Sequence, residues 1–332
     1  MRSRARYSPE VAQAPAAAGK PAAGKPAAGK PAAGKPAAGK WLAGARPRTL
    51  PAAVVPVAVG TAVAWSSRSI GHGIGAFPWW RAGCALVVAL AVQVGTNYAN
   101  DYSDGVRGTD DARQGPMRLV ASGAASPSAV RAAAIAAFGL AGVAGLAIAA
   151  ATSWWLVALG AACFAAGWLY TGGPHPYGYA GFGELFVFVF FGLVATVGTA
   201  YVLGGDQAHL LEVASLAALP AGLLAVALLL ANNLRDIAGD SLTGKHTLAV
   251  RVGRRAAGWL YVAVLAGAVA GIAAVATWRP WALLALLGAP LAVRPTRLAL
   301  SGAGGRDLLP MLADTGRLQL AAGLLLAVGI LL

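Results

Sequence analysis

The sequence predicts an all-α integral membrane protein, a bundle of about nine transmembrane helices with its N-terminus on the cytoplasmic side. The 332 residues are 58% hydrophobic and only 11% charged, whereas soluble domains carry about 25% charged residues. Apolar runs long enough to cross a bilayer recur from Leu50 onward. The basic residues are concentrated in the connections on one side. These observations exclude a soluble globular enzyme.

Residues 1–40 form a predicted disordered tail built on an Ala-Ala-Gly-Lys-Pro repeat. Proline at every fifth position breaks a helix, and residues 17–40 offer no apolar side chain larger than Ala to bury. Ten of the 26 Lys and Arg residues lie in residues 1–48, where Glu10 is the only acid. A basic tail beside apolar segments is typical of a cytoplasmic membrane flank, not of a nucleic-acid-binding protein. The tail is therefore either a solvated linker or a contact for anionic lipid.

Residues 41–332 form the predicted transmembrane domain. We expect spans at 50–66, 80–100, 127–151, 153–171, 183–204, 213–236, 256–277, 280–294 and 314–332. The span at 280–294 is short and contains Pro290. No apolar stretch precedes the repeat, so we expect no cleavable secretory signal.

The distribution of basic residues predicts the orientation of the bundle. With the tail inside, 23 of the 26 Lys and Arg residues fall on the cytoplasmic side, and only Arg68, Arg81 and Arg279 fall outside. Seven of the ten Trp residues fall at the predicted outer ends of spans, where amphipathic rings favour the membrane interface.

Two acidic patches lie on the predicted cytoplasmic side. The first reads NYANDYSDGVRGTDD over 97–111, and the second reads NNLRDIAGDSLTGKHT over 232–247. If each span continues as a helix, one face of the first carries Asn97, Asn100, Asp101 and Asp104, and one face of the second carries Asn232, Asp236 and Asp240. A charge at membrane depth costs a few kcal/mol or more, so two such patches on one side indicate a function beyond helix capping.

The chemistry of these patches suits a cation and a phosphorylated substrate. Mg²⁺ takes oxygen ligands and characteristically bridges one or two carboxylates to substrate phosphates. Arg107, Arg235 and Lys245 lie beside the acids and can pair with phosphate directly. The pattern therefore predicts a substrate with an apolar tail and a diphosphate head.

A third motif, YTGGPHPYGYAGFGE, occupies 170–184. Its dense Gly and Pro predict a tight connection that approaches other elements closely. Tyr170, Tyr177 and Tyr179 either turn aromatic faces toward an allylic carbocation or lie at the membrane interface. Glu184 is either a buried functional acid or an acid favoured at a helix start by the helix dipole.

These motifs resemble those of the UbiA-type intramembrane aromatic prenyltransferases. The resemblance rests on NDYSD, NNLRDIAGD and YTGGPHPYGY, with support from WLAGARPRTLPAAVVPVAVGTA (41–62), GPMRLVASG (115–123) and GKHTLAVRVG (244–253), and it covers residues 41–332. The motifs TNYANDYSDGVRGTDD and YTGGPHPYGY favour the branch whose acceptor is 1,4-dihydroxy-2-naphthoate over the 4-hydroxybenzoate branch.

The resemblance implies a UbiA-like bundle in the bacterial plasma membrane, a polar cavity near the cytoplasmic face and Mg²⁺ as cofactor. The implied substrates are a polyprenyl diphosphate and 1,4-dihydroxy-2-naphthoate, giving demethylmenaquinone. The implied metal ligands are Asn100, Asp101, Asp104, Asp110, Asp111, Asn232, Asp236 and Asp240. The implied catalytic residues are Asp104, Asp236, Asp240, Arg107 and Lys245. The implied substrate-binding residues are Asn97, Asn100, Asn232, Asn233, Arg235, Tyr170, Arg46 and Arg48, the last two near the aromatic acceptor.

Two other functions remain to be weighed against this one. A prenyltransferase of the same superfamily could use another aromatic acceptor, such as 4-hydroxybenzoate. A membrane transporter could also carry intramembrane carboxylates, but transport sites usually lie near the bilayer midplane between internal repeats. The acids of this sequence lie at one face, and we find no internal sequence repeat in the spans.

Overall fold

The computed structural model describes residues 37–68, 77–109 and 117–332, and the regular secondary structure of these residues is entirely helical. Residues 36–332 form one compact unit. The helix α1 begins at Ala37, upstream of the expected boundary between residues 40 and 41. The disorder expected for the tail falls on residues 1–36, which lie outside the described residues, and on the first residues of α1.

The helical elements follow one another along the chain with short connections. In order they are α1 (Ala37–Ala45), η1 (Pro47–Thr49), α2 (Pro51–Ser66), α3 (Trp79–Arg107), α4 (Pro127–Ala151), α5 (Trp155–Leu169), η3 (Tyr177–Ala180), α6 (Gly183–Val187), η4 (Phe188–Val194), α7 (Ala195–Gly204), α8 (Ala208–Leu242), α9 (Leu248–Ala276), η5 (Pro280–Ala292), α10 (Val293–Leu300), η6 (Gly305–Leu308) and α11 (Leu309–Leu331).

The described helices confirm the prediction of a multispanning bundle. Seven of them are long and apolar enough to cross a membrane. An eighth span results if α1 and η1 are joined to α2 across a bend of 56°. The helix α5 is apolar but has only 15 residues. By the bounds given above, each of the nine predicted segments is helical in the described structure.

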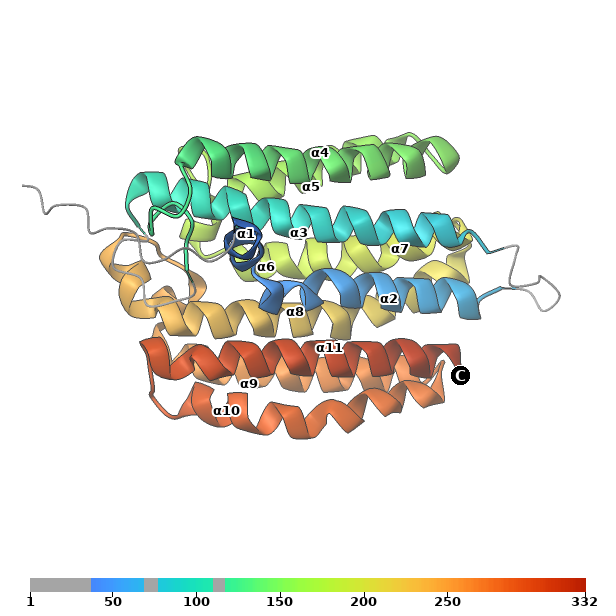
Figure 1. Cartoon of the computed structure of the whole chain (residues 1–332). Coiled ribbons are helices and arrows are strands. Elements are labelled where there is room, and N and C mark those ends of the chain that lie inside the picture. The colour runs from blue at the N-terminus through green and yellow to red at the C-terminus, as the bar shows by residue number, and fades with distance from the viewer. Residues whose placement is uncertain (1–36, 69–76, 110–116) are drawn as a thin grey trace, which may run out of the picture. The chain divides into compact units, whose positions relative to one another are not determined.

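The helix α8 forms the centre of the bundle. Of its most apolar stretch 72% is buried, against 28% for α9 at the periphery. It packs against α2, α7, α9 and α11, and Figure 1 shows these long helices running alongside one another. A central helix in a membrane protein must be apolar on nearly all sides, which explains why residues 213–234 of α8 carry so few polar groups.

Small residues allow α8 to approach the π-helical segment η4 closely. The π-helical η4 meets α8 at Gly192, where an added Cβ would lie 2.7 Å from the Cα of Gly222. Close backbone approach through glycine is a common way to pack membrane helices, because lipid supplies no hydrophobic force between them. This contact fixes the distance between η4 and α8.

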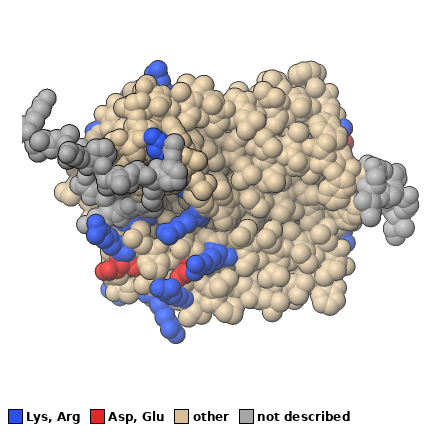
Figure 2. Space-filling model, in the orientation of Figure 1, with Lys and Arg blue, Asp and Glu red and all other residues tan. Residues whose placement is uncertain are grey.

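The outward face of the bundle is apolar, and its charged side chains gather at the ends. Large apolar side chains such as Val143 and Leu287 are more than half exposed, as expected for a surface that faces lipid. Figure 2 shows Lys and Arg grouped toward the left end of the visible face, where α3 and α8 end in Figure 1. Trp79, Trp154 and Trp281 are about half exposed or more, and each lies at the start of a helix or within one residue of it.

The helices α3 and α8 extend beyond the C-terminal ends of their predicted spans. The helix α3 continues to Arg107 and α8 continues to Leu242, so the described residues of both acidic patches lie on helices except for residues 108–109 and 243–247. The third difference concerns 280–294. There the chain forms a 3₁₀ helix from Pro280 to Ala292, with Pro290 inside it, and then the helix α10.

Candidate active site

A cavity of about 510 Å³ runs along the interior of the bundle. Its wall is mostly Ala, Val, Leu, Gly and Phe from α2 to α8. Polar side chains line only part of it, and these are Arg46, Thr49, Gln93, Thr96, Asn97, Asn100, Tyr170, Tyr177, Thr199 and Asn232. The cavity therefore combines a polar region with a long apolar region.

One polar wall of the cavity comes from α3 and the bend before α2. The amide Nδ2 of Asn97 donates to the carbonyl of Ala45 at 2.9 Å and to Thr49 Oγ1 at 3.2 Å. The amide Nε2 of Gln93 donates to the same hydroxyl at 3.1 Å. Gln93 and Asn97 lie one helical turn apart, so α3 presents a continuous polar face.

Arg46 lies in the bend between α1 and η1. It has a φ of 54°, and among the described residues it alone has a positive φ without being Gly. Such a conformation is uncommon for a side chain of this kind and is retained where the surrounding structure holds it. Its Nη2 donates to the carbonyl of Asn97 at 3.4 Å, and Arg46 lines the cavity. Arg48, predicted with it, is exposed and is not part of the cavity wall.

Asp101 lies on α3 and is fully buried. Its two carboxylate oxygens accept the backbone N–H groups of Leu119 at 2.8 Å and Val120 at 3.0 Å. The carboxylate therefore fixes the chain segment that precedes α4. It lies one residue beyond Asn100, which lines the cavity and accepts a 2.8 Å hydrogen bond from Thr171 Oγ1.

Asp104 connects the first acidic patch to the second. It is 1% exposed and accepts a 2.7 Å hydrogen bond from the Tyr179 hydroxyl. Lys245 Nζ lies 3.5 Å from Asp104 Oδ2, and Arg118 Nη2 lies 3.8 Å from the same oxygen. Because Asp104 belongs to α3 and Lys245 follows α8, this ion pair brings the two patches together at one end of the bundle.

The second patch is organised around Arg235 on α8. The guanidinium donates two 2.7 Å hydrogen bonds to the carboxylate of Asp236 and a third of 2.7 Å to Asn232 Oδ1. Asn232 lines the cavity, while Asn233 turns the other way and donates to Glu184 Oε1 at 2.9 Å. Asp240 is half-buried one turn further on, and its carbonyl accepts the Lys245 N–H.

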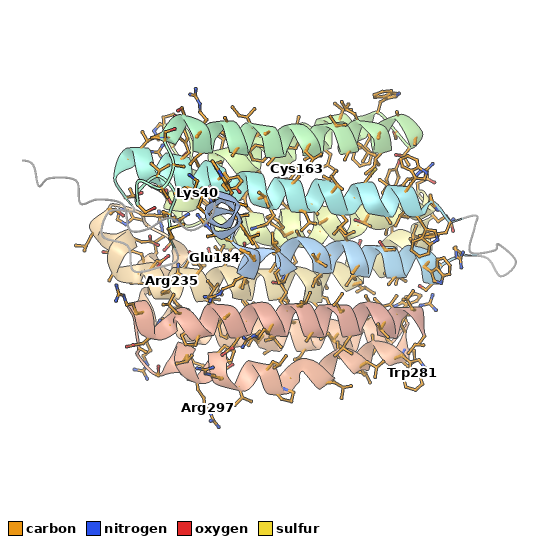
Figure 3. All side chains as sticks on the ribbon, viewed as in Figure 1. Lys40, Cys163, Glu184, Arg235, Trp281 and Arg297 are labelled. Carbon is orange, nitrogen blue, oxygen red and sulfur yellow. The ribbon has the colours of Figure 1, made fainter. Side chains whose placement is uncertain are left out.

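Figure 3 labels two members of this region. It shows Glu184 and Arg235 toward the same end of the bundle, with Trp281 at the opposite end. Glu184 and Arg235 therefore belong to the end of the bundle where α3 and α8 end.

The connection after α5 covers the polar end of the cavity. Arg107 donates to the carbonyls of Thr171 and Gly173 and lies over the ring of Tyr179. Tyr170 lines the cavity and Tyr177 stacks on Phe186 with the ring centroids 3.9 Å apart. Tyr170 and Tyr177 thus line the cavity and Tyr179 does not, and a role of their rings toward an allylic cation stays a prediction.

The tyrosine hydroxyls of this connection are held in their neutral form. Burial and then the charge of Glu184 keep the pKa of Tyr170 well above its usual range. Burial raises the pKa of Tyr177. Burial and the charge of Asp104 raise the pKa of Tyr179. Tyr179 is therefore a stable hydrogen-bond donor to Asp104 at any physiological pH.

The structure brings most of the predicted residues to one end of one cavity. Asn97, Asn100, Tyr170, Asn232 and Arg46 line it. A second group of predicted residues is not part of the cavity wall but belongs to the neighbouring ends of α3 and α8: Asp101, Asp104, Arg107, Asn233, Arg235, Asp236, Asp240 and Lys245. Asp110 and Asp111 lie outside the described residues.

Several polar groups of the site were not predicted. Thr49 and Gln93 line the cavity, and Arg118 is 7% exposed beside Asp104. Helical periodicity could have found Gln93, since it lies one turn before Asn97 on the same face. No local pattern marks Thr49 or Arg118, whose roles depend on how distant segments meet.

Comparison with known proteins identifies the family. The profile of the UbiA prenyltransferase family matches residues 53–302. This chain belongs to that family. Within it, the chain is 49% identical to the 1,4-dihydroxy-2-naphthoate octaprenyltransferase of Mycobacterium tuberculosis over 288 residues, which are 86% of this chain and 94% of that protein. The Escherichia coli enzyme of the same name is 37% identical over 298 residues, covering 86% and 93% of the two chains.

Solved structures of UbiA homologues share the fold at low sequence identity. The apo structure of a UbiA homologue from Aeropyrum pernix superposes with a TM-score of 0.62 at 17% identity and covers 85% of this chain and 96% of its own. A homologue from Archaeoglobus fulgidus bound to DMAPP and Mg²⁺ gives a TM-score of 0.52 at 18% identity and covers 87% and 99%. The bundle is therefore a UbiA-type fold.

Proposed function

We propose that this protein transfers a polyprenyl group from a polyprenyl diphosphate to 1,4-dihydroxy-2-naphthoate, with release of diphosphate and CO₂. The direct product of these redox-neutral bond changes is demethylmenaquinol, the reduced form of demethylmenaquinone and an intermediate of menaquinone biosynthesis. The observation that carries the proposal is the ion pair of Asp104 and Lys245, which joins two acidic helix ends above one mainly apolar cavity. Relatives that are about half identical over most of their length carry the corresponding name.

The polar end of the cavity binds the diphosphate of the donor. Arg235 Nη1 is buried and has no hydrogen-bond partner among the described residues, so it can donate to a phosphate oxygen. Lys245 supplies a second positive charge that is 13% exposed. Both cations lie beside carboxylates, which orient them and keep the site close to neutral until the substrate arrives.

The apolar part of the cavity binds the prenyl tail. Its wall excludes water, and a dry wall protects an allylic cation from capture by water. The rings of Tyr170, Phe186 and Phe190 line it and can stabilise the cation through their faces. Binding of the tail therefore also positions the reacting carbon near the polar end.

The residues present fit Mg²⁺. Asp104 and Asp236 are buried carboxylates, and Asn100 and Asn232 add amide oxygens, which together form the hard oxygen donor set that Mg²⁺ prefers. The described part of the chain has no group of three acidic, His or Cys side chains gathered around one point. Mg²⁺ does not need one, because it is usually held by one or two carboxylates together with substrate phosphates. When bound, it neutralises charge on the departing diphosphate.

The bond changes balance without a strong protein base. The allylic C–O bond of the donor breaks, and its electron pair leaves with the diphosphate. The naphthoate carbon that bears the carboxylate forms the new C–C bond to the allylic carbon. The bond to the carboxylate then breaks, and its electrons restore the aromatic ring as CO₂ leaves.

The polar wall of Arg46, Thr49, Gln93 and Asn97 orients the acceptor. It lines the same cavity as Asn100 and Asn232 and offers one cation and several hydrogen-bonding groups. A guanidinium pairs well with a carboxylate, and the amide and hydroxyl groups suit the two ring hydroxyls. This wall therefore supports an aromatic acceptor that carries a carboxylate.

The polar end faces the cytoplasm in this proposal. The chain is an integral membrane protein of many apolar helices, and the positive-inside rule assigns the side rich in Lys and Arg to the cytoplasm. Arg118, Arg235, Lys245 and Arg254 all belong to the end where α3 and α8 terminate. Water-soluble naphthoate then reaches the site from the cytoplasm.

An acceptor panel with purified protein, Mg²⁺ and geranylgeranyl diphosphate tests the proposal. We expect a prenylated product from 1,4-dihydroxy-2-naphthoate whose mass reports the loss of CO₂, together with released diphosphate. Prenylation of 4-hydroxybenzoate in preference to the naphthoate would assign the protein to the other branch. Release of no diphosphate with any acceptor would contradict prenyl transfer altogether.

A further inference from the structure

Glu184 is a buried acid with one polar partner on another helix. It belongs to α6 and is 8% exposed. Its Oε1 accepts a 2.9 Å hydrogen bond from Asn233 Nδ2, and its Oε2 is buried with no hydrogen-bond partner among the described residues. The bond joins α6 to the C-terminal third of α8, which carries one of the two acidic patches.

The position of Asn233 on α8 gives this bond its importance. Asn233 follows Asn232, which lines the cavity, and precedes Arg235 and Asp236, which pair with each other. Neighbouring residues of a helix differ by about 100° in direction. If Asn233 is held toward α6, Asn232 must face the cavity and Asp236 keeps its place beside Arg235.

The same bond locates the aromatic wall of the cavity. The helix α6 continues directly into η4, and Phe186, Phe190 and Phe191 of this stretch line the cavity. A second close contact, of Gly192 with Gly222, joins η4 to α8 further along. The two contacts fix both the rotation of α8 and its distance from the aromatic wall.

We propose that Glu184 is a positioning residue that sets the rotation of α8 through Asn233 and so orients the Asn232–Asp236 segment toward the diphosphate of the donor. This inference rests on the proposed function. It assigns Glu184 no contact with substrate, and it uses only one of the two carboxylate oxygens. A neutral amide that keeps the Oε1 acceptor is therefore sufficient for the role.

The first test compares four purified variants by steady-state kinetics with geranylgeranyl diphosphate and 1,4-dihydroxy-2-naphthoate. Glu184→Ala and Asn233→Ala should each raise the KM for the donor about tenfold, the effect of losing one buried hydrogen bond, and leave the KM for the acceptor unchanged. Glu184→Gln should stay within about twofold of the wild type. Glu212→Gln, at an exposed acid of α8, is the matched control, and its KM values should be unchanged.

A reversed pair separates positioning from general stability. Asn233→Asp places two carboxylates face to face and should weaken donor binding. Adding Glu184→Gln to that variant restores one donor and one acceptor in reversed order and should recover most of the donor affinity. Recovery by a second substitution at the same contact is not expected of a merely damaged fold. If Glu184→Ala does not fold, Asn233→Ala and the reversed pair carry the test.

The outcomes also separate this inference from the proposed function. Equilibrium binding of geranylgeranyl diphosphate is measured for each variant without acceptor. Normal donor affinity in Asn233→Ala, failure of the reversed pair, or a Glu184→Gln variant as impaired as Glu184→Ala would overturn the positioning role while wild-type turnover persists. A wild-type protein that neither binds the donor nor prenylates the naphthoate would overturn the proposed function, and the inference with it.

Discussion

Asp104 is the single residue on which most contacts of the candidate site converge. Tyr179 donates to one of its oxygens, and Lys245 and Arg118 lie near the other. Without the Asp104 carboxylate, the two neighbouring cations would leave a net positive charge at this buried point. Charges separated from water are weakly screened, so the two cations would repel each other. Asp104 therefore balances the charge of the cations beside it, and its role in the donor site stays a prediction.

Replacement of Asp104 tests its role in turnover. Asp104→Asn keeps the size of the side chain and removes its charge, so prenyl transfer should fall by about 100-fold or more, as is common when a transition-state charge loses its stabilisation. The measurement is the initial rate in membranes supplied with Mg²⁺. Asp206→Asn, at an exposed connection outside the site, should keep the wild-type rate. Near-normal turnover of Asp104→Asn would contradict the assignment.

The buried tyrosines predict how stability depends on pH. The pKa values of Tyr170, Tyr177 and Tyr179 are raised in the folded protein, first by burial, whereas the unfolded chain ionises at about pH 10. The unfolded state therefore loses these protons first, and the folded state is destabilised as pH rises above about 10. The Tm of the detergent-solubilised protein should fall between pH 9.5 and 11, and Tyr179→Phe should reduce the slope. Equal slopes would show that Tyr179 does not contribute.

At the scale of elements, α7 supplies a position that can limit the length of the prenyl tail. Gly198 lines the cavity, and a Cβ added there would meet no atom within 4 Å. A larger side chain at this position therefore projects into open space that the tail would occupy. Its packing against other helices should change little.

Gly198→Leu should consequently shorten the donors that the protein accepts. We expect turnover of geranyl diphosphate to be retained and turnover of longer donors to fall about tenfold, since the cost of the steric conflict is on the order of 1–3 kcal/mol. Product masses from a mixture of donors measure the effect. Gly139→Leu is the matched control, because Gly139 is exposed on α4, has equal space for a Cβ and lies outside the cavity wall. An unchanged product distribution would remove Gly198 from the tail site.

The close contact of η4 with α8 gives a prediction about stability. In Gly222→Val the new side chain would meet the Cα of Gly192 at 2.9 Å and the ring of Phe188. Overpacking of this kind costs about 1–3 kcal/mol, and the Tm should fall by several degrees. Gly239→Val on the same helix meets no atom within 4 Å, so it carries the same helix-propensity cost without the clash. Equal Tm values for the two variants would contradict the packing argument.

Helices were easier to predict than the contacts between them. The length and hydropathy of each segment depend only on local sequence, so all nine predicted segments are helical. The predicted ends of the helices were less accurate, because α3 and α8 extend beyond their apolar stretches into polar residues such as Asp104 and Asp240. The bond of Asp101 to the N–H groups of Leu119 and Val120 depends on the path of a connection, which no periodicity encodes.

At the scale of the whole molecule, the described site residues begin at Arg46 and the family match begins at residue 53. Removal of residues 1–35 should therefore leave the initial rate of prenyl transfer within about twofold of the wild type. A twofold change in rate corresponds to a change of less than about 0.5 kcal/mol in the activation free energy. Removal of residues 1–49 deletes Arg46 and Thr49 from the cavity wall and should abolish turnover. Loss of activity in the shorter deletion, at equal protein level, would give the tail a direct role.

The ion pair of Asp104 and Lys245 has a consequence for biogenesis, because its partners are 141 residues apart. A ribosome that has inserted α3 into the membrane must still synthesise α4 to α8 before Lys245 emerges. Throughout that interval Asp104 lacks its later neighbour Lys245, while Arg118, which pairs with the same oxygen, is made well before it. An arrested chain that stops before residue 245 therefore contains the elements from α1 to α8 but lacks the ion pair that joins the ends of α3 and α8.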